Sequence, residues 1–410
     1  MSESTSNDIP IYDKGPLESI RVLELGSLLA GPFAGRLLGD FGAEVIKLES
    51  PDAPDLMRQW GPHLYKGRGL LWPIQSRNKK CITLNLREAA GRDILRRLVV
   101  QSDVMIENFR PGTMEKWGLG WDELSALNPR LVMTRVSGFG QTGPYRERAG
   151  FGSVGEAIGG VRYVTGFPDR PPVRIGISLG DSLAAMFATI GTLAAIEHRH
   201  RSGRGQMVDC AIYESIFALM ESVITEYDKV GAVRERLGLI LPKVAPSNVY
   251  PTRDDRLLIV AANQDAVFKR LAILMGQPEL AEDPRYATHA ARGERQHEVD
   301  EIVTAWTRQH DSGELWTLLN DGGVPAGPIY SAADIAEDEQ YRARGAIRTM
   351  NDPEMGDLKM PGIVPRLSET PGVLKWTGPA RPGTHNREIY GDLLGIGDDE
   401  LTRLGEAGII

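Results

Sequence analysis

The stretch IRVLELGSLLAGPFAGRLLGDFGAEVIKLE, residues 20–49, decides the fold of this chain. It begins with a short apolar strand pattern, continues through a loop into an amphipathic helix, and ends in a second strand pattern, EVIKLE. A strand, a helix and a strand in this order form a βαβ unit with two parallel strands. The opening stretch therefore predicts an α/β fold built on a parallel sheet.

The same alternation continues along the chain. CITLNL (81–86), DVMIENF (103–109) and LVMTRVSGFG (131–140) have strand patterns, and AAGRDILRRLVVQS (89–102) has a helical one. Short apolar strands that alternate with helices indicate a parallel sheet covered on both faces. Ligands of such sheets bind beyond the carboxyl ends of the strands, so we expect the functional residues directly after these segments.

The second half of the chain has a different organisation. SLAAMFATIGTLAAIEHRH (182–200) is apolar on nearly every face and predicts a buried helix, and MVDCAIYE (207–214) predicts a strand that leads into further helix. From Gly231 to Pro251 the composition is that of a linker. A small α/β region follows from Leu257 to about Pro328.

Composition excludes several classes of function. The 410 residues include 55 acidic and 47 basic ones, a formal charge of −8, so no global positive field draws the chain to nucleic acid or to an anionic membrane. Cys81 and Cys210 are far apart, which argues against a disulfide framework or a zinc site. The N-terminus has no signal-peptide pattern, and we expect no apolar run of the ~18 residues that span a bilayer. A soluble, cytoplasmic protein is expected.

Histidine and glycine spacing also excludes two kinds of site. His198 and His200 lie too close in sequence to share a helical face, so no metal site is expected. Gly26, Gly31 and Gly35 do not have the G-x-G-x-x-G spacing, which disfavours a nicotinamide enzyme.

Basic residues recur near the predicted strand ends of this acidic chain. Each one alone is an ordinary surface charge, but their recurrence at the expected ligand-binding edge suggests contacts with phosphate groups. These residues are Lys79, Lys80, Arg87, Arg110 and Lys116. The sequence Asn108-Phe109-Arg110 also offers an amide, an aromatic face and a guanidinium to an adenine nucleotide, although the same residues would suit an ordinary turn.

Asp181 precedes the long apolar helix and follows a glycine. Aspartate is a favoured residue at the N-cap of a helix, so a purely structural role is one interpretation. A carboxylate in this position could also attack a thioester, with backbone N–H groups stabilising the oxyanion. The pattern alone leaves both interpretations open.

Several motifs in the same order resemble the family III CoA transferases, the group of formyl-CoA transferase and carnitine CoA-transferase. These are VLELGSLLAGPFAGRLLGDFGAEVIKLE (22–49), RNKKCITLNL (77–86), ENFRPGTMEKWGL (107–119), SGFGQTGP (137–144) and GDSLAAMFATIGTLAAIEHRHRSGRGQ (180–206). The resemblance implies a large Rossmann-like domain built from both chain ends, a smaller α/β domain, and two ring-shaped protomers threaded into an interlocked homodimer. With it we expect residues 1–230 in the large domain, 231–256 as a linker, 257–330 as the small domain, and 331–410 as a return linker and the rest of the large domain.

The resemblance also implies roles for single residues. Asp181 matches the catalytic aspartate, Leu84, Asn108 and Phe109 match CoA-contacting positions, and Lys116 stands where formyl-CoA transferase has arginine. Leu29 replaces a glutamine of formyl-CoA transferase, and its glycine-rich loop is not found here, which speaks against a formyl-CoA and oxalate pair. His385 also matches a family histidine, without an assigned role.

The implied activity is a ping-pong transfer of CoA from an acyl-CoA to a free carboxylic acid, through an aspartyl anhydride and an aspartyl-CoA thioester. CoA enters as a substrate, and no permanently bound cofactor is expected. One alternative is an isomerase like the α-methylacyl-CoA racemases, which share the fold but have a histidine where this chain has Phe151. An apolar ring cannot transfer a proton. The other alternative is a CoA-binding protein without catalysis, against which the retained Asp181 motif argues.

Overall fold

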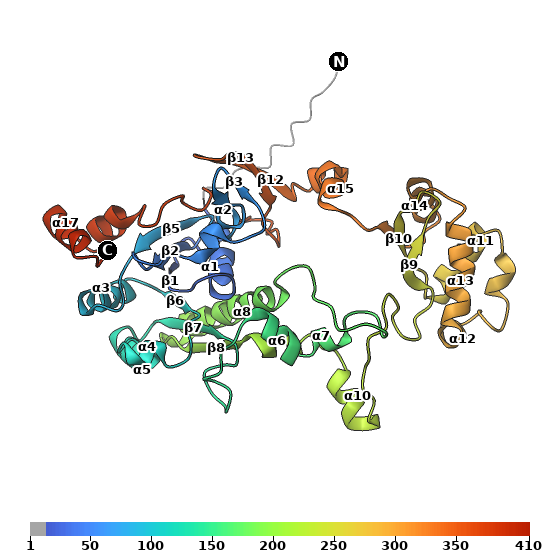
Figure 1. Ribbon diagram of the computed structural model, residues 1–410, viewed down its shortest axis with the longest axis horizontal. Helices are drawn as coiled ribbons and strands as arrows, with labels where there is room; N and C mark the ends of the chain where they lie inside the picture. The colour runs from blue at the N-terminus through green and yellow to red at the C-terminus, as the bar shows by residue number, and fades with distance from the viewer. Residues whose placement is uncertain (1–13) are drawn as a thin grey trace, which may run out of the picture. The chain divides into compact units, whose positions relative to one another are not determined.

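The computed structural model describes residues 14–410, and these form two compact units (Figure 1). The first unit contains residues 14–161, 175–230 and 340–410. The second contains Arg162–Arg174 and Gly231–Glu339. The short segment Arg162–Arg174 of the second unit carried no recognisable signal in the sequence.

A six-stranded sheet forms the centre of the first unit, in the order β5-β2-β1-β6-β7-β8. All five neighbouring pairs are parallel, which confirms the predicted α/β fold. The strands are β1 (Arg21–Glu24), β2 (Glu44–Glu49), β5 (Lys79–Thr83), β6 (Val104–Glu107), β7 (Val132–Ser137) and β8 (Met207–Ala211). Because all six run in one direction, their carboxyl ends lie at one edge of the sheet.

Alternate residues of the strands feed two separate apolar cores, because successive side chains of a strand point to opposite faces. Val22 packs in the core that contains α1 (Ala30–Asp40) and α8 (Leu179–Ser202). Its neighbour Leu23 packs in the core that contains α3 (Ala89–Val100), α5 (Trp121–Leu127) and α17 (Asp398–Glu406). Helices therefore cover both faces of the sheet, as predicted (Figure 1).

The remaining helices and strands of the first unit are short. The helices are α2 (Leu71–Gln75), α3 (Ala89–Val100), α4 (Thr113–Lys116), α5 (Trp121–Leu127), α6 (Gly152–Ile158), α9 (Ile212–Phe217), α10 (Val223–Val230) and α17 (Asp398–Glu406), with the 3-10 helix η1 (Leu56–Gln59) and the π-helix η3 (Arg387–Leu393). Two hairpins pair β3 (Leu64–Tyr65) with β4 (Arg68–Gly69), and β12 (Ile347–Asp352) with β13 (Gly356–Pro361). Helices α7 (Val161–Val164) and α16 (Glu339–Ala343) lie where the chain passes from one unit to the other.

The length of α8 corrects one expectation from the sequence. This helix has 24 residues and, by its length and composition alone, is long and apolar enough to cross a membrane. However, Ala184, Ala188 and Thr192 of α8 are fully buried, and the hydroxyl groups of Thr192 and Thr134 in β7 lie 2.6 Å apart. We therefore interpret α8 as a core helix that covers the sheet.

The segment MVDCAIYE differs from the expected single strand, since β8 ends at Ala211 and α9 begins at once. In α9 the buried residues are Ile212, Ser215 and Ile216, which is the i, i+3, i+4 spacing of one helical face. Strand-like residues at the start of α9 hid this helical period in the sequence.

The second unit is built on a three-stranded antiparallel sheet in the order β11-β10-β9. Its strands are β9 (Ser247–Pro251), β10 (Leu257–Ala261) and β11 (Ala326–Pro328). Its helices are α11 (Asp265–Leu274), α12 (His289–Glu294), α13 (Gln296–Thr307), α14 (Ser312–Asp321) and α15 (Ala332–Glu337), with the turn η2 (Pro278–Ala281). Strand β9 falls inside the segment 231–256, which was expected to be a linker. It belongs to the folded unit instead, because its Tyr250 is buried in the core.

The C-terminal segment covers the free edge of strand β5. The backbone N–H of His385 donates to the carbonyl of Cys81, and the N–H of Cys81 donates to Nδ1 of His385 at 3.0 Å. Two residues along the strand, the N–H of Thr83 donates to Oδ1 of Asn386, and Nδ2 of Asn386 donates to the hydroxyl oxygen of Thr83. Exposed strand edges invite pairing with other chains, and these contacts occupy the edge instead.

Candidate active site

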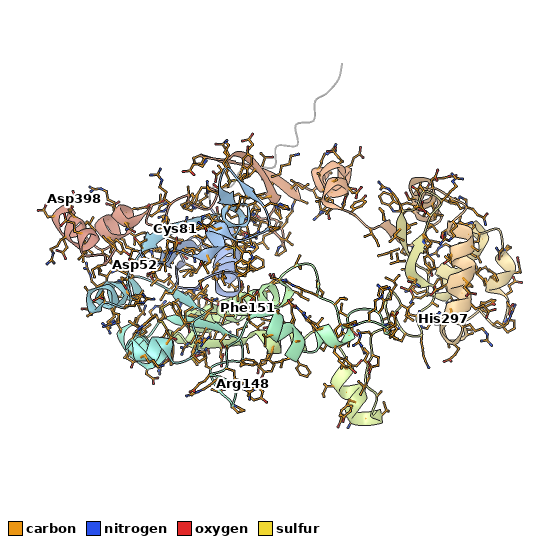
Figure 2. All side chains as sticks on the ribbon, in the orientation of Figure 1. Asp52, Cys81, Arg148, Phe151, His297 and Asp398 are labelled. Carbon is orange, nitrogen blue, oxygen red and sulfur yellow. The ribbon has the colours of Figure 1, made fainter. Side chains whose placement is uncertain are left out.

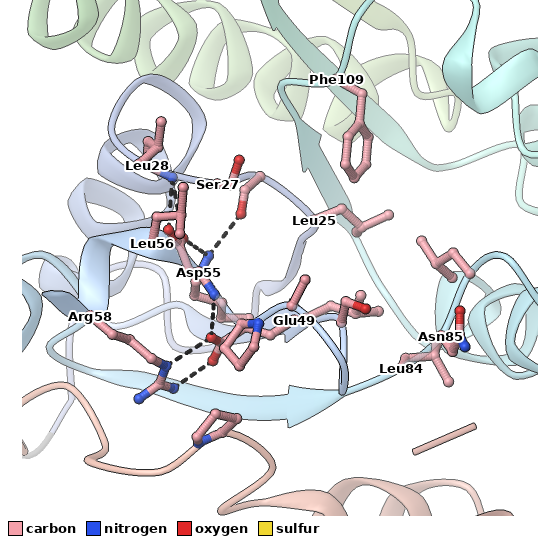
Figure 3. A pocket seen from close by; sticks show the side chains of 18 of the residues that line it. Leu25, Ser27, Leu28, Glu49, Asp55, Leu56, Arg58, Leu84, Asn85 and Phe109 are labelled. Atoms are coloured by element: carbon pink, nitrogen blue, oxygen red, sulfur yellow. Dashed lines mark hydrogen bonds and ion pairs between the residues drawn. The ribbon is translucent and has the colours of Figure 1, made fainter. Parts of the chain in front are cut away.

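A cavity of about 760 Å³ lies at the carboxyl ends of four adjacent strands. The loop after β1 supplies Leu25 to Leu28, and β2 and the turn after it supply Leu48 to Ser50. The segments after β5 and β6 supply Leu84 to Arg87 and Phe109. Figure 3 shows side chains from these segments around the cavity. The cavity therefore lies where the functional residues are expected, beyond the carboxyl ends of parallel strands.

The cavity's first loop, Gly26 to Leu28, has a backbone conformation that its sequence does not favour. Leu28 has φ +62°, a left-handed conformation that costs a bulky residue roughly 1–2 kcal/mol. Its N–H donates to the carboxylate of Asp55 at 3.1 Å, and Asn108 exchanges two 2.9 Å hydrogen bonds with the backbone of Ser27. Side chains from elsewhere in the chain thus hold the loop in place.

Buried charges lie directly beneath this loop. Lys47 donates to the carbonyl of Gly26 at 2.8 Å and forms ion pairs with Glu24 and Asp55. Burial acts to raise the pKa of Asp55, but the charge and hydrogen bond of Lys47 and the N–H groups of Met57 and Leu28 together outweigh it, so the pKa lies below its ordinary value. Both groups are therefore charged at neutral pH. A second pair, Arg58 with Glu49, lines the cavity beside Asp55 (Figure 3).

Most of the expected CoA-contacting residues lie at this cavity. Leu84, Arg87 and Phe109 line it, and Asn108 holds the Ser27 backbone at its rim. Trp117 also lines it and meets the ring of Phe109 edge-on, with 5.5 Å between the ring centroids. Trp117 was not singled out from the sequence, although it stands beside Lys116 in the motif that carried the resemblance.

Other basic residues that were candidate phosphate ligands lie elsewhere. Arg110 and Lys116 are exposed and do not line the described cavity. Lys79 is buried at the start of β5, where it pairs with Glu24, and Lys80 pairs with two glutamates. The latter two lysines therefore bind the protein's own carboxylates, which corrects their interpretation as phosphate ligands. Sequence could not show this, because their partners come from distant strands and from the C-terminal segment.

Asp181 lies in the first turn of α8, as its third residue. The cap position belongs to Ser178, so the interpretation of Asp181 as the N-cap is wrong. The Asp181 carboxylate lies against Gly152, the first residue of α6: a Cβ added to Gly152 would be 2.4 Å from Oδ2. Gly150 in turn contacts Gly138, which directly follows β7. Asp181 therefore lies at the same edge of the sheet as the cavity, although it does not line the cavity itself.

Phe151 occupies the N-cap position of α6, next to Gly152 (Figure 2). Phe151 is 49% exposed, and its ring has no group that exchanges a proton. Within residues 14–410, no group of three or more histidine, cysteine, aspartate or glutamate side chains could hold a metal ion.

Comparison with known proteins identifies the family. Residues 17–386 match the family described as CoA-transferase family III. The chain is also 58% identical over 395 residues to succinyl-CoA–D-citramalate CoA-transferase of Chloroflexus aurantiacus, which covers 96% of this chain and 98% of the relative. The chain belongs to CoA-transferase family III. This family III chain is therefore a CoA-transferase, and CoA thioesters are its substrates.

More distant relatives agree with this assignment of the family III enzyme. It is 34% identical over 411 residues to formyl-CoA:oxalate CoA-transferase of Streptomyces coelicolor, covering 96% of this chain and 99% of the relative. A crystal structure of a CAIB/BAIF family protein from Brucella suis matches with a TM-score of 0.82 at 34% identity, over 93% of this chain and all of that one. The resemblance drawn from the motifs is confirmed.

Proposed function

We propose that this enzyme moves CoA from succinyl-CoA to a hydroxylated dicarboxylic acid such as citramalate, with Asp181 as the nucleophile. The observation that carries the substrate proposal is the 58% identity over nearly the whole chain to a transferase named for succinyl-CoA and D-citramalate. Two further relatives at 40% identity are named as subunits of a succinyl-CoA–L-malate transferase. All three names pair succinyl-CoA with a small hydroxy dicarboxylate.

In the proposed mechanism, an oxygen of the Asp181 carboxylate attacks the thioester carbonyl, the C–S bond breaks, and CoA thiolate leaves. The thiolate then attacks the carbonyl carbon of Asp181 in the resulting anhydride. This forms the aspartyl-CoA thioester and releases the first acid as its carboxylate. The incoming acid reverses the two steps. The thioester is not hydrolysed, so its free energy is conserved in the product.

The cavity supports the proposal that CoA binds beyond β1, β2, β5 and β6. Its wall includes the aromatic faces of Phe109 and Trp117 for a base, and the exposed guanidinium of Arg87 for phosphate. Asp181 lies beside the next strand, β7, so a long extended molecule such as CoA can join the two places. We also propose Arg110 and Lys116, which are exposed near this edge, as outer phosphate contacts.

We further infer that the active form is the interlocked homodimer of cytoplasmic family III enzymes. Support comes from the apolar residues that α8 leaves exposed: Met186, Ile190 and Leu193 have the i, i+4, i+7 spacing of one helical face. Contiguous apolar surface of this kind marks protein contacts. A single dimeric mass in light scattering is expected, and a monomer at micromolar concentration would contradict it.

The substrate proposal is tested by a panel of acids. The purified enzyme is incubated with succinyl-CoA and one acid at a time: D-citramalate, L-citramalate, L-malate, glutarate or oxalate. A hydroxy dicarboxylate should give the highest kcat/KM, and an enzyme that prefers oxalate or glutarate would contradict the proposal. Asp181→Asn should lower kcat by about 10³-fold or more, since an amide is a poor nucleophile, whereas unchanged activity would remove Asp181 from the mechanism.

A further inference from the structure

The turn that carries Asp181 is held by helix α6 through two residues of the same helical face. The first is Gly152, against which the Asp181 carboxylate lies. The second is Glu156, which is four residues later and therefore about one turn along α6. Both are buried, and both contact the first turn of α8.

Glu156 supplies the hydrogen-bond acceptor that the N-cap residue of α8, Ser178, does not provide. The first N–H groups of any helix have no acceptor inside the helix, and a side chain at the N-cap usually takes one of them. Ser178 at the N-cap of α8 makes no such bond. Instead, Oε1 of Glu156 accepts the N–H of Gly180 at 3.2 Å. Gly180 is the residue directly before Asp181.

Close packing between the two helices fixes this arrangement. A Cβ on Gly180 would lie 2.8 Å from the carbonyl oxygen of Gly152, so neither glycine leaves room for a side chain. Further along α6, a Cβ on Gly155 would lie 2.5 Å from the side chain of Ile212 in α9. The glycines of α6 thus allow its backbone to rest directly on the turn with Asp181.

Burying a carboxylate costs free energy unless it makes hydrogen bonds, and Glu156 is only 2% exposed. An apolar side chain of similar size would fill the same space without that cost. The hydrogen bond to Gly180 is a contact that only an acceptor can make. This gives a chemical reason for a hydrogen-bond acceptor at position 156.

We infer that Glu156 is a positioning residue for Asp181, because its bond to Gly180 fixes the direction in which the next side chain points. The inference rests on the proposed role of Asp181 as nucleophile. Asp181 must be aligned twice in each half-reaction, first as the attacking carboxylate and then as the carbonyl under attack. Misplacement of a reacting group by about 1 Å can cost on the order of 10²-fold in rate.

The test compares Glu156→Ala with Glu156→Gln. The alanine variant should lose about 10- to 100-fold in kcat with KM for succinyl-CoA changed less than about threefold, because the cavity residues lie on other segments. The glutamine variant should keep kcat within about threefold, because its amide oxygen still accepts the N–H of Gly180. A glutamine variant as slow as the alanine variant would overturn the inference, and so would an alanine variant with unchanged kcat.

A matched control removes a different bond between a carboxylate and a backbone N–H. Asp103 accepts the N–H of Arg21 at 2.8 Å and precedes β6, at the opposite edge of the sheet. Asp103→Ala should lower the melting temperature and leave kcat unchanged. If Glu156→Ala does not fold, Glu156→Leu replaces it, since an apolar side chain of similar size fills the space but cannot accept the N–H of Gly180. We expect it to lower kcat about tenfold or more, and an unchanged kcat would overturn the inference.

One measurement separates this inference from the proposed function. The amount of CoA bound covalently to Asp181 is measured in the wild-type enzyme first. If none forms, the nucleophile proposal fails and the inference falls with it. If it forms at the same rate in wild type and Glu156→Ala, the nucleophile proposal stands and only the role of Glu156 is contradicted. A slower rate in the alanine variant supports both.

Discussion

Nζ of Lys47 lies 2.8 Å from Oδ2 of Asp55, with both side chains buried beneath the cavity. Each of the two also holds one residue of the loop after β1: Lys47 binds the carbonyl of Gly26, and Asp55 binds the N–H of Leu28. A buried ion pair is expensive to desolvate, and here it fixes a loop that lines the cavity. The ion pair therefore serves to maintain the shape of the binding site.

Replacing Asp55 tests this relationship. Asp55→Ala leaves Lys47 with one carboxylate fewer and frees Leu28 from its left-handed conformation, so we expect a loss of about 3–5 kcal/mol in the free energy of unfolding. KM for succinyl-CoA should also rise about tenfold, because the loop no longer shapes the cavity. Asp55→Asn, which keeps an acceptor for Leu28, should raise KM less. Equal KM values in all three proteins would contradict the role of the pair.

Arg87 tests where the phosphate groups of CoA bind. Arg87→Ala should raise KM for succinyl-CoA about three- to tenfold at low salt, because an exposed cation at the cavity is lost. The difference from wild type should shrink as the salt concentration rises. Lys269→Ala, which removes an exposed charge from α11 in the second unit, is the control with unchanged KM. An unchanged KM in the Arg87 variant would show that the phosphate groups of CoA bind elsewhere.

His385 should make the stability of the enzyme depend on pH. Burial lowers the pKa of His385 below its ordinary value, with Glu388 acting in the opposite direction, and its Nδ1 accepts the N–H of Cys81. Below about pH 6.5 the unfolded chain therefore binds a proton that the folded chain resists, so the free energy of unfolding should fall as pH falls from about 7 to 5.

Urea denaturation at several pH values measures this effect. His385→Asn should have lower stability at neutral pH and a weaker pH dependence than wild type. His297→Asn changes an exposed histidine of α13 and should keep the wild-type dependence. If His385→Asn keeps the full dependence on pH, another group is responsible.

The two cysteine thiols should be unreactive in the folded enzyme. Burial raises the pKa of Cys81 to about 12, and burial likewise raises the pKa of Cys210. Iodoacetamide at about pH 8 should therefore leave native activity unchanged and should alkylate both thiols only after unfolding. Rapid loss of activity on alkylation of the native protein would show that a thiolate takes part in catalysis.

The sequence predicted the parallel sheet because its strands and helices repeat with clear periods over residues 20–140. Arg87 and Phe109 were expected near one edge of the sheet, because residues after parallel strands share that edge, whereas Leu84 came only from the family resemblance; all three line the cavity. The start of α9 and the strand β9 were missed, since short segments with mixed residues have no distinct period.

Other features depended on contacts between distant segments. Lys79 and Lys80 had the charge of phosphate ligands, but their partners Glu24, Glu44 and Glu388 are brought to them only by the folded sheet and by the C-terminal segment. The packing of Gly152 against Asp181 joins residues of two helices, α6 and α8, that are separated in sequence by residues 159–178. No local pattern contains contacts of this kind. The ion pairs of the two lysines and the contact between Gly152 and Asp181 therefore could not be predicted from the sequence.

The most direct test of Asp181 as the nucleophile is mass spectrometry of the enzyme after a short incubation with succinyl-CoA in the absence of an acceptor acid. The account predicts a covalent adduct with the mass of CoA less one water, located on the peptide that contains Asp181. The adduct should disappear when the acceptor acid is added, and Asp181→Asn should not form it. A stable adduct on any other residue, or full turnover by Asp181→Ala, would contradict the account.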